Sequence, residues 1–293
     1  MNPPESAIVH LALPKGRMEQ GVRELLADAG IRIRTDARAY RPSLSIQGFE
    51  TKLLKPQNIV GMLTEGSRDI GFAGADWVAE RDAPLIELLD TGLDPVRIVL
   101  AAPTEVVENG RFVAPAGRPP RIASEYERLT TRWIESNLAG AKFVRAHGAT
   151  EVFPPEDADA IVDNTATGST LRANGLVIVE DVMRSSTRLY ANPMALEEPD
   201  KRRAIDDFVL VLRAVLEARQ RAMIELNVGA DALDRVVDGL PCMRRPTVST
   251  LHEGSGYAVR AAVPRTDLPR LVPDLKARGA TDIVVSTIEQ IVP

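Results

Sequence analysis

Short apolar runs alternate with stretches of helical spacing over the first two thirds of the chain. Residues 8–13, 97–102 and 158–162 are apolar runs of strand length. After the first run, apolar residues repeat every three or four positions up to Gly30, at Met18, Val22, Leu25, Leu26 and Ala29. Residues 59–66 and 129–138 also have helical character. Strands that alternate with helices predict an open α/β sheet.

Two segments are predicted to connect separate lobes of this α/β region. Residues 106–120 contain polar residues, two glycines and three prolines, which predicts a crossover out of the first lobe. Residues 177–190 are predicted to cross back. We therefore assign residues 1–104 and 184–205 to lobe I and residues 105–183 to lobe II, with one cleft between them.

The pattern changes after Pro193, where a long helix is predicted to begin within residues 199–203. Its apolar face consists of Ile205, Phe208, Val209, Leu212, Val215 and Leu216. Beyond it, strands are predicted at 222–228, 247–251, 257–263 and 282–287, and helices at 230–237 and 268–277. The order βαββαβ is that of a ferredoxin-like module, which we assign to residues 206–293.

Composition excludes several classes of protein. The chain has 293 residues, 44% of them hydrophobic, and a formal charge of -5. This charge argues against a general nucleic-acid surface, although it allows a local basic pocket. The single Cys242 excludes a disulfide framework within the chain and a cysteine-rich metal site. An apolar run of 18 residues is absent, and residues 1–6 lack a basic leader pattern, so we expect a cytoplasmic protein without membrane spans.

Residues 158–176 carry the most informative chemistry. An apolar run ends at Asp163, and a polar loop with Gly168 inside it follows over residues 164–170. Main-chain N–H groups and hydroxyls can donate to phosphate oxygens, and the carboxylate of Asp163 can accept from ribose hydroxyls. The hydroxyls in this loop belong to Thr165, Thr167, Ser169 and Thr170. Alternatively, the segment is a strand-to-helix turn in which these hydroxyls only cap the helix.

Two other segments are candidates for ligand binding. Lys15 and Arg17 follow the first predicted strand, where ligands bind in open α/β sheets, and two cations there suit a polyphosphate. A solvated basic turn is the alternative. Residues 69–77 contain Gly71 and Gly74, which permit close approach of a ligand to the backbone. We expect Trp77 to pack in the core rather than to stack on a base.

Other patterns carry no chemistry. Residues 254–259 begin like a dinucleotide fingerprint but precede a predicted strand, which indicates a hairpin turn. A Walker loop and a serine nucleophile elbow are absent from the sequence. The histidines at positions 10, 147 and 252 lack metal-ligand spacing and are expected to be structural.

Five motifs together resemble one family over nearly the whole chain. They are Leu-Pro-Lys-Gly-Arg at 13–17, Asp-Ile-Gly-Phe-Ala-Gly-Ala-Asp at 69–76, Gly-Ala-Thr-Glu-Val at 148–152, Asp-x-x-x-Thr-Gly-x-Thr-Leu at 163–171 and Arg-Pro-Thr-Val-Ser-Thr-Leu at 245–251. They resemble the long form of ATP phosphoribosyltransferase, the enzyme of the first step of histidine biosynthesis. The resemblance implies a two-lobed catalytic region like periplasmic binding proteins, followed by a ferredoxin-like regulatory domain.

The resemblance also implies an activity, a cofactor and partners. N1 of ATP would displace pyrophosphate from phosphoribosyl pyrophosphate, with Mg2+ held mainly by substrate and water. Free histidine would inhibit, and the chain would form a homo-oligomer, a dimer or a hexamer. Neither nucleic acid nor a membrane is an expected partner.

Site residues follow from the same motifs. The implied catalytic residues are Lys15, Arg17 and Asp163. Those implied to bind phosphoribosyl pyrophosphate are Asp163, Thr165, Ala166, Thr167, Gly168, Ser169 and Thr170. Those implied to bind ATP are Arg38, Lys55, Asp69, Gly71, Gly74 and Asp76. Thr247 and Ser249 would bind the histidine effector.

Three residues depart from the family pattern. Asn164 stands where the family usually has an aliphatic residue, and Lys55 and Asn58 stand where it commonly has arginine and aspartate. Lysine keeps the charge of arginine but loses its bidentate geometry. These departures favour an alternative in which the two-lobed chain is a non-catalytic sensor of small molecules. A related transferase with another acceptor base is a third possibility.

Overall fold

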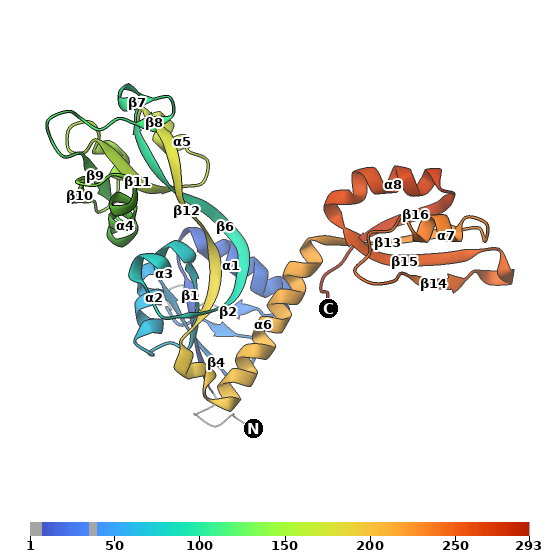
Figure 1. Ribbon diagram of the computed structural model, residues 1–293. Coiled ribbons are helices and arrows are strands. Elements are labelled where there is room, and N and C mark those ends of the chain that lie inside the picture. Colours follow the sequence, from blue (N-terminus) through green and yellow to red (C-terminus); the bar gives the residue numbers. More distant parts are fainter. Residues whose placement is uncertain (1–7, 35–39, 293) are drawn as a thin grey trace. The chain divides into compact units, whose positions relative to one another are not determined.

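The computed structural model describes residues 8–34 and 40–292, and the chain divides into two compact units. The first unit holds the chain up to Glu24 and Arg32–Ile205, and the second holds Leu25–Ile31 and the chain from Asp206 onwards. The helices α1 (Arg17–Asp28) and α6 (Pro199–Arg219) each begin in the first unit and end in the second. Figure 1 shows the elements in chain order.

One sheet of eight strands, in the order β10-β9-β11-β6-β12-β5-β1-β4, runs through the first unit. The strands are β1 (Val9–Pro14), β4 (Phe49–Leu54), β5 (Ile70–Gly74), β6 (Ile86–Pro103), β9 (Arg121–Ser124), β10 (Lys142–Arg145), β11 (Ala160–Thr165) and β12 (Leu176–Ala191). We call β1, β4 and β5 with their helices the first lobe, and β9, β10 and β11 with theirs the second lobe. Pairing is parallel within each lobe, as in other α/β proteins.

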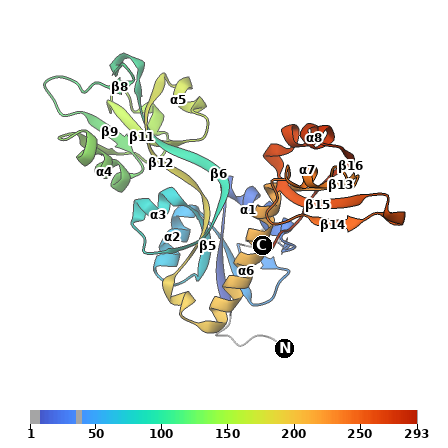
Figure 2. The same cartoon turned by 45° about the vertical axis from the view of Figure 1, so that its right-hand side comes forward.

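The two lobes are joined by β6 and β12, which are 18 and 16 residues long and pair with each other in the antiparallel sense. At one end β12 pairs with β5, and at the other β6 pairs with β11 (Figure 2). The return crossing predicted at residues 177–190 lies in β12.

The outward crossing predicted at residues 106–120 was wrong, because β6 carries the chain into the second lobe before that segment begins. Residues 106–120 instead contain the short hairpin of β7 (Val107–Glu108) and β8 (Arg111–Phe112). Its apolar side chains pack in the same cluster as Trp133. The glycines and prolines of residues 106–120 indicate turns, as in this hairpin. The crossing itself is a long continuous strand, β6, which pairs with β11 and β12. A second short pair, β2 (Ile33–Arg34) and β3 (Ser43–Leu44), lies in the first lobe.

Four further helices belong to the first unit: α2 (Pro56–Thr64), α3 (Ala75–Arg81), α4 (Glu127–Asn137) and α5 (Ser169–Ala173). Helix α2 packs on the sheet through Ile59, Val60 and Leu63, which are fully buried. A Cβ atom at Gly71 would lie 2.7 Å from Cγ2 of Ile59 and 2.9 Å from Cβ of Ala12. Glycine at 71 therefore allows α2 to lie close against β5 and β1.

The strand before the polar loop is longer than its apolar run predicted. β11 continues through Asp163, Asn164 and Thr165, which pair with Val99, Ile98 and Arg97 of β6. The polar loop is thus confined to residues 166–168 before α5. Polar residues at the end of a strand predict a loop from the sequence alone. In the structure these residues remain in the strand, because β6 pairs with them through main-chain hydrogen bonds.

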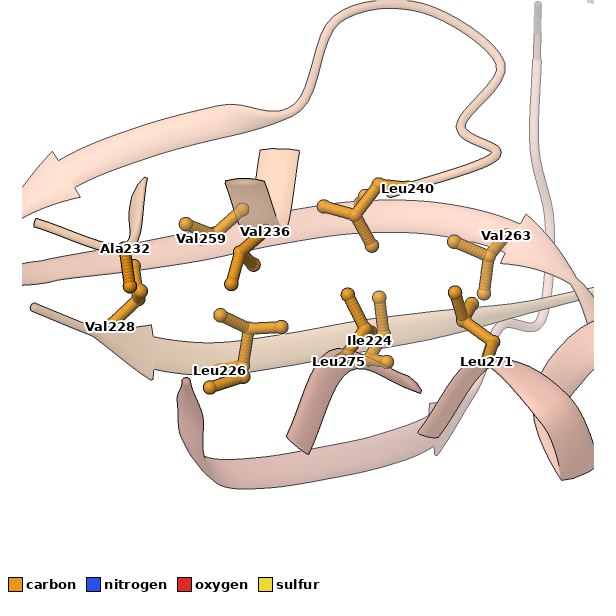
Figure 3. Close-up of a cluster of buried hydrophobic side chains, with 12 residues drawn as sticks. Ile224, Leu226, Val228, Ala232, Val236, Leu240, Val259, Val263, Leu271 and Leu275 are labelled. Carbon is orange, nitrogen blue, oxygen red and sulfur yellow. The ribbon is translucent and has the colours of Figure 1, made fainter. Parts of the chain in front are cut away.

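The second unit contains an antiparallel sheet of order β14-β15-β13-β16. Its elements are β13 (Arg221–Val228), α7 (Leu233–Val237), β14 (Thr247–Thr250), β15 (Tyr257–Pro264), α8 (Leu268–Ala277) and β16 (Ala280–Thr287). Every second residue of β13 is buried, and Figure 3 shows Ile224, Leu226 and Val228 within the apolar cluster that α8 closes. The predicted ferredoxin-like order and the α/β class are confirmed. Within residues 8–34 and 40–292, no helix combines the length and apolar character that crossing a bilayer requires.

Candidate functional site

Two polar cavities of the first unit adjoin each other. The first, which we call the cleft cavity, has a volume of about 250 Å³ and lies between the lobes. The second, the loop cavity, has a volume of about 370 Å³ and lies in the second lobe beside the polar loop. Glu125 and Asn164 line both. A ligand in one cavity is therefore a neighbour of a ligand in the other.

The loop cavity gathers the residues that the sequence motif predicted. Asp163, Thr165, Ala166, Thr167, Ser169 and Thr170 line it, together with residues 148–151 from another segment. Gly168 does not line it. This glycine has a φ of +73°, and a Cβ there would lie 3.0 Å from Nη1 of Arg172, so it shapes the turn instead.

Hydroxyls within the loop hold its shape. Oγ1 of Thr165 accepts the main-chain N–H of Gly168 at 2.8 Å, and Oγ1 of Thr167 donates to Oγ of Ser169 at 3.1 Å. Thr165 is buried, whereas Thr167, Ser169 and Thr170 are exposed to the cavity. Thr165 braces the turn and the other hydroxyls face the cavity, whereas the N-terminus of α5 has no side-chain cap. Phosphate binding by these hydroxyls stays a prediction.

Asp163 lines the loop cavity and has a carboxyl of raised pKa. Burial raises the pKa of its carboxyl to about 6, and the nearby Glu151 and Glu125 act in the same direction. The main-chain N–H of Asn164 donates to Oδ1 at 2.6 Å and opposes this rise. A carboxylate in these surroundings gains from hydroxyl donors such as those of a ribose.

On the first-lobe side of the cleft cavity, Asp76 is buried and both of its carboxylate oxygens accept hydrogen bonds. Its Oδ1 accepts the hydroxyl of Ser185 at 2.6 Å and its Oδ2 accepts the hydroxyl of Tyr126 at 2.8 Å. A Cβ at Gly74 would lie 2.2 Å from Oδ1 of Asp76, so glycine at 74 is what allows the carboxylate this position. Burial and Asp76 raise the pKa of the Tyr126 phenol, which therefore stays protonated and donates.

Tyr126 was missed in the sequence. It belongs to the second lobe, yet its ring packs against that of Trp77 with centroids 4.9 Å apart. Trp77 packs with apolar residues of both lobes, as expected, and also lines the cleft cavity. The only signal for Tyr126 was its place just beyond β9, at the carboxyl end of a parallel strand.

A direct bond between helices joins the lobes near this site. Oε1 and Oε2 of Glu80 in α3 accept the main-chain N–H groups of Arg128 and Leu129, each at 3.0 Å. These groups lie in the first turn of α4, where helix N–H groups need an outside acceptor. The adjacent Asp82 binds the guanidinium groups of Arg128 and Arg132.

The basic side of the cleft is built around Lys15, which follows β1. Lys15 lines the cleft cavity with Arg17 and also lines a third cavity of about 350 Å³ with Arg41, Lys52 and Lys55. Its Nζ lies 3.5 Å from the ring centroid of Tyr40. Four cations around one cavity suit a polyphosphate. Arg38, predicted to join them, lies outside the described residues.

Asp69 and Gly71, which were predicted to bind the nucleotide, do not line the cleft cavity. Asp69 precedes β5 and Gly74 ends it, so they lie about 16 Å apart at the usual rise of a strand. Asp69 is buried away from the cleft cavity, where it accepts the main-chain N–H of His10 and binds Nζ of Lys201 at 3.2 Å. Gly71 lies under α2, as described above. Neither residue lines the cleft cavity, the loop cavity or the third cavity, whereas Asp76 of the same motif lines the cleft cavity.

In the second unit, the predicted effector residues lie on the edge strand β14 and are exposed. Thr247 and Ser249 pair with Arg260 and Ala258 of β15, so both side chains are on the same face of the sheet. Thr247 lines a cavity of about 300 Å³ with Arg244, Arg245 and Arg260, whereas Ser249 does not line it. Their role as an effector site remains a prediction.

A preformed metal cage is absent from the part of the chain that the structure describes, where no three His, Cys, Asp or Glu side chains are arranged to hold an ion. Glu125, Glu151 and Asp163 line the loop cavity without forming such a group.

Comparison with known proteins identifies the family of the chain. A family model described as ATP phosphoribosyltransferase matches residues 55–214, and a model of the HisG C-terminal domain matches residues 218–290. The ATP phosphoribosyltransferase of Chlorobaculum parvum is 34% identical over 291 residues, which are 97% of this chain and 98% of that protein. That of Pelotomaculum thermopropionicum is 33% identical over 290 residues, 97% of this chain and 99% of that protein.

A solved structure agrees with these relatives. The "ATP phosphoribosyl transferase (HisG:HisZ) complex" from Thermotoga maritima contains a chain similar to this one, with a TM-score of 0.62 and 27% identity. The similarity covers 72% of this chain and 99% of that chain. With both family models matched in order along its length, the chain belongs to the ATP phosphoribosyltransferase family.

Proposed function

We propose that this protein transfers the phosphoribosyl group of phosphoribosyl pyrophosphate to N1 of ATP, giving phosphoribosyl-ATP and pyrophosphate as the first step of histidine biosynthesis. One observation carries the proposal. The loop cavity, with Asp163 and its hydroxyls, adjoins the cleft cavity, with Lys15 and Arg17, at Glu125 and Asn164. A transferase of this kind needs two such neighbouring sites, because both substrates must be held with their reacting atoms in contact.

In the loop cavity, Asp163 would accept hydrogen bonds from the ribose hydroxyls. The exposed hydroxyls and main-chain N–H groups of residues 166–170 would bind the 5′-phosphate. N1 of adenine attacks C1 of the ribose as the bond to pyrophosphate breaks, so a protein nucleophile is unnecessary. Positive charge develops on the ribose in the transition state, and the ionised carboxylate of Asp163 would stabilise it.

On the other side, the cations would bind the phosphates. Lys15 lines both the cleft cavity and the third cavity that it shares with Arg41, Lys52 and Lys55, so it would contact phosphate groups bound in either. Arg17 would assist in the cleft, Lys55 and Arg38 would bind the triphosphate, and Asp76 with Gly74 would shape the nucleotide side. Charge grows on the departing pyrophosphate during the reaction, which is where fixed cations lower the barrier.

We propose that Mg2+ enters as part of the substrate, bound to the pyrophosphate oxygens and water. Such a complex needs at most one or two protein carboxylates. Glu151 and Asp163 line the loop cavity, where phosphoribosyl pyrophosphate would bind. Both proposed substrates are cytoplasmic metabolites, and the cytoplasm is the proposed location.

We further propose that histidine inhibits through the second unit and that the chain forms a homo-oligomer, a dimer or a hexamer. The residues that line the two substrate cavities all belong to the first unit, which leaves the second unit available for regulation. An effector that binds in a separate unit inhibits only by binding two states of the protein with different affinity.

The test of the activity is direct. The full chain is mixed with ATP, phosphoribosyl pyrophosphate and Mg2+, and phosphoribosyl-ATP is followed by its absorbance and by mass spectrometry. Product that requires all three components supports the proposal. Binding of either substrate without turnover would instead favour the sensor, and turnover with another purine nucleotide but not with ATP would favour a different acceptor.

A further inference from the structure

Asn164, the departure within the loop motif, lies where the two cavities meet. Its Nδ2 is 3.2 Å from the hydroxyl oxygen of Tyr126 and 3.3 Å from Oδ1 of Asp163. Its side chain is exposed and lines both cavities. The side-chain amide thus connects the carboxylate of the loop cavity with the phenol of the cleft cavity.

The donors and acceptors determine which side chain can make this connection. Tyr126 has one phenolic proton and gives it to Oδ2 of Asp76 at 2.8 Å. Its oxygen, and the carboxylate of Asp163, can then only accept. The group between them must supply two N–H donors, which the NH2 of asparagine does and which an aliphatic or carboxylate side chain cannot do.

We propose that Asn164 is a positioning residue, whose amide fixes the carboxylate of Asp163 for the ribose by tying it to Tyr126 and Asp76 of the nucleotide side. The inference rests on the proposed function, because it takes Asp163 as the ribose-binding group. The amide would preorganise the Asp163 carboxylate, because a carboxylate that is held in place before the substrate arrives loses less conformational freedom on binding.

The charges around Asp163 give the amide a second effect. The groups that face this carboxyl are the main-chain N–H of Asn164, which leucine at 164 would retain, together with Glu151, Glu125, the hydroxyl of Thr150 and the Asn164–Tyr126 pair, with Asp76 behind the phenol. Two of these are carboxylates that disfavour ionisation of Asp163. An N–H donor favours the ionised form, so loss of the amide should raise the pKa of Asp163 further.

The test replaces Asn164 by leucine, which is of similar size and cannot donate. We expect Asn164→Leu to lower kcat/KM for phosphoribosyl pyrophosphate by about tenfold and to leave the KM for ATP within about twofold. The acidic limb of its pH profile should move upward by about half a unit to one unit. Asn137→Leu is the matched control, because Asn137 donates to the carbonyl of Trp133 within its own helix and lines neither the cleft cavity nor the loop cavity.

A double variant tests whether the amide acts through Tyr126. Tyr126→Phe in the Asn164→Leu background should lower kcat/KM less than it does in the wild type, because the bond between the two residues is already lost. Full additivity would overturn the link to Tyr126. An Asn164→Leu variant whose kcat/KM and pH profile equal those of Asn137→Leu would overturn the positioning role.

A measurement without turnover separates this inference from the activity. The carboxyl carbon of Asp163 is titrated by 13C NMR in the free full chain, with Asp163→Asn to assign its signal. A higher pKa in Asn164→Leu than in the wild type supports the role of the amide, and an equal pKa overturns it. If the wild type forms no phosphoribosyl-ATP, the proposed function fails while this titration still decides the contact.

Discussion

The side chain of Glu80 caps a helix that belongs to the other lobe, because its carboxylate accepts the main-chain N–H of Leu129 in the first turn of α4. The residue at the N-terminal boundary of α4, Tyr126, makes no side-chain cap of its own. Two free N–H groups in the first turn of α4 therefore obtain their protein acceptor from α3.

Removing this cap should weaken both the fold and the cleft. We expect Glu80→Ala to lower the free energy of unfolding by about 1 kcal/mol, the usual effect of losing a helix cap. The KM values for both substrates should rise, because the lobes that hold them are no longer bonded through this carboxylate. Calorimetry and initial rates measure the two effects, and Glu135→Ala on an exposed site of α4 is the control. Unchanged KM values would show that Glu80 only stabilises the helix.

Asp163 is expected to be essential for turnover. Asp163→Ala should reduce kcat/KM by two orders of magnitude or more, about 3 kcal/mol of transition-state stabilisation. Because its pKa is about 6, the activity of the wild type should fall as the pH drops below that value. The circular dichroism spectrum of the variant should match that of the wild type. Near-normal turnover would remove Asp163 from the site.

The same carboxyl should destabilise the folded protein at neutral pH. Its pKa is about 6 in the folded chain and near 3.8 in the absence of burial, so ionisation favours the unfolded state. Its contribution is most favourable below about pH 4 and is lost as the pH rises through 6. At pH 8, the free energy of unfolding of Asp163→Asn should therefore exceed that of the wild type by about 1–2 kcal/mol. At pH 4 the two free energies should be nearly equal. Denaturant titrations at both pH values measure them. An equal difference at both values would contradict this account.

Two glycines of one motif should behave differently. Gly71→Ala should lower the melting temperature, because its methyl group would meet Ile59 and Ala12, while the KM for ATP stays near that of the wild type. Gly74→Ala should displace the carboxylate of Asp76 and raise that KM. Thermal unfolding and steady-state rates distinguish them. A large rise of KM in Gly71→Ala without loss of stability would restore Gly71 to the nucleotide site.

Histidine inhibition is best tested with point variants of the full chain. Truncation near Asp200 would remove Lys201, which binds the buried Asp69 of the first unit. Ser249→Ala and Thr247→Ala should reduce inhibition by millimolar histidine and retain turnover. Thr250→Ala is the control, because Thr250 alternates to the opposite face of the same strand. Equal inhibition of all three variants would place the effector elsewhere.

The sequence predicted well where a pattern is local. The position of Lys15 beyond β1 and the order of elements in the second unit follow from apolar spacing and turn residues alone. Asp69 and Asp76 could also have been separated in advance, because five strand residues between them place them at opposite ends of β5.

Contacts between distant segments could not be predicted. Tyr126 reaches Asp76 across 50 positions, and Glu80 reaches Leu129 across 49. Neither pair leaves a spacing pattern, because each depends on how two lobes meet. The departure of Asn164 from the family pattern is visible in the sequence. Its proposed role could not be predicted there, because it depends on the contact with the hydroxyl of Tyr126.

The antiparallel ribbon of β6 and β12 has a mechanical consequence. Two hydrogen-bonded strands resist stretching and sliding but twist and bend readily, most of all where their register shifts. One such shift lies between Ser185 and Thr187, and both residues line the cleft cavity. The irregular stretch of the ribbon and part of the cleft cavity are thus formed by the same few residues. A substrate that contacts Ser185 or Thr187 would bind directly to this bendable stretch. Binding in the cleft and the angle between the two lobes would then be coupled.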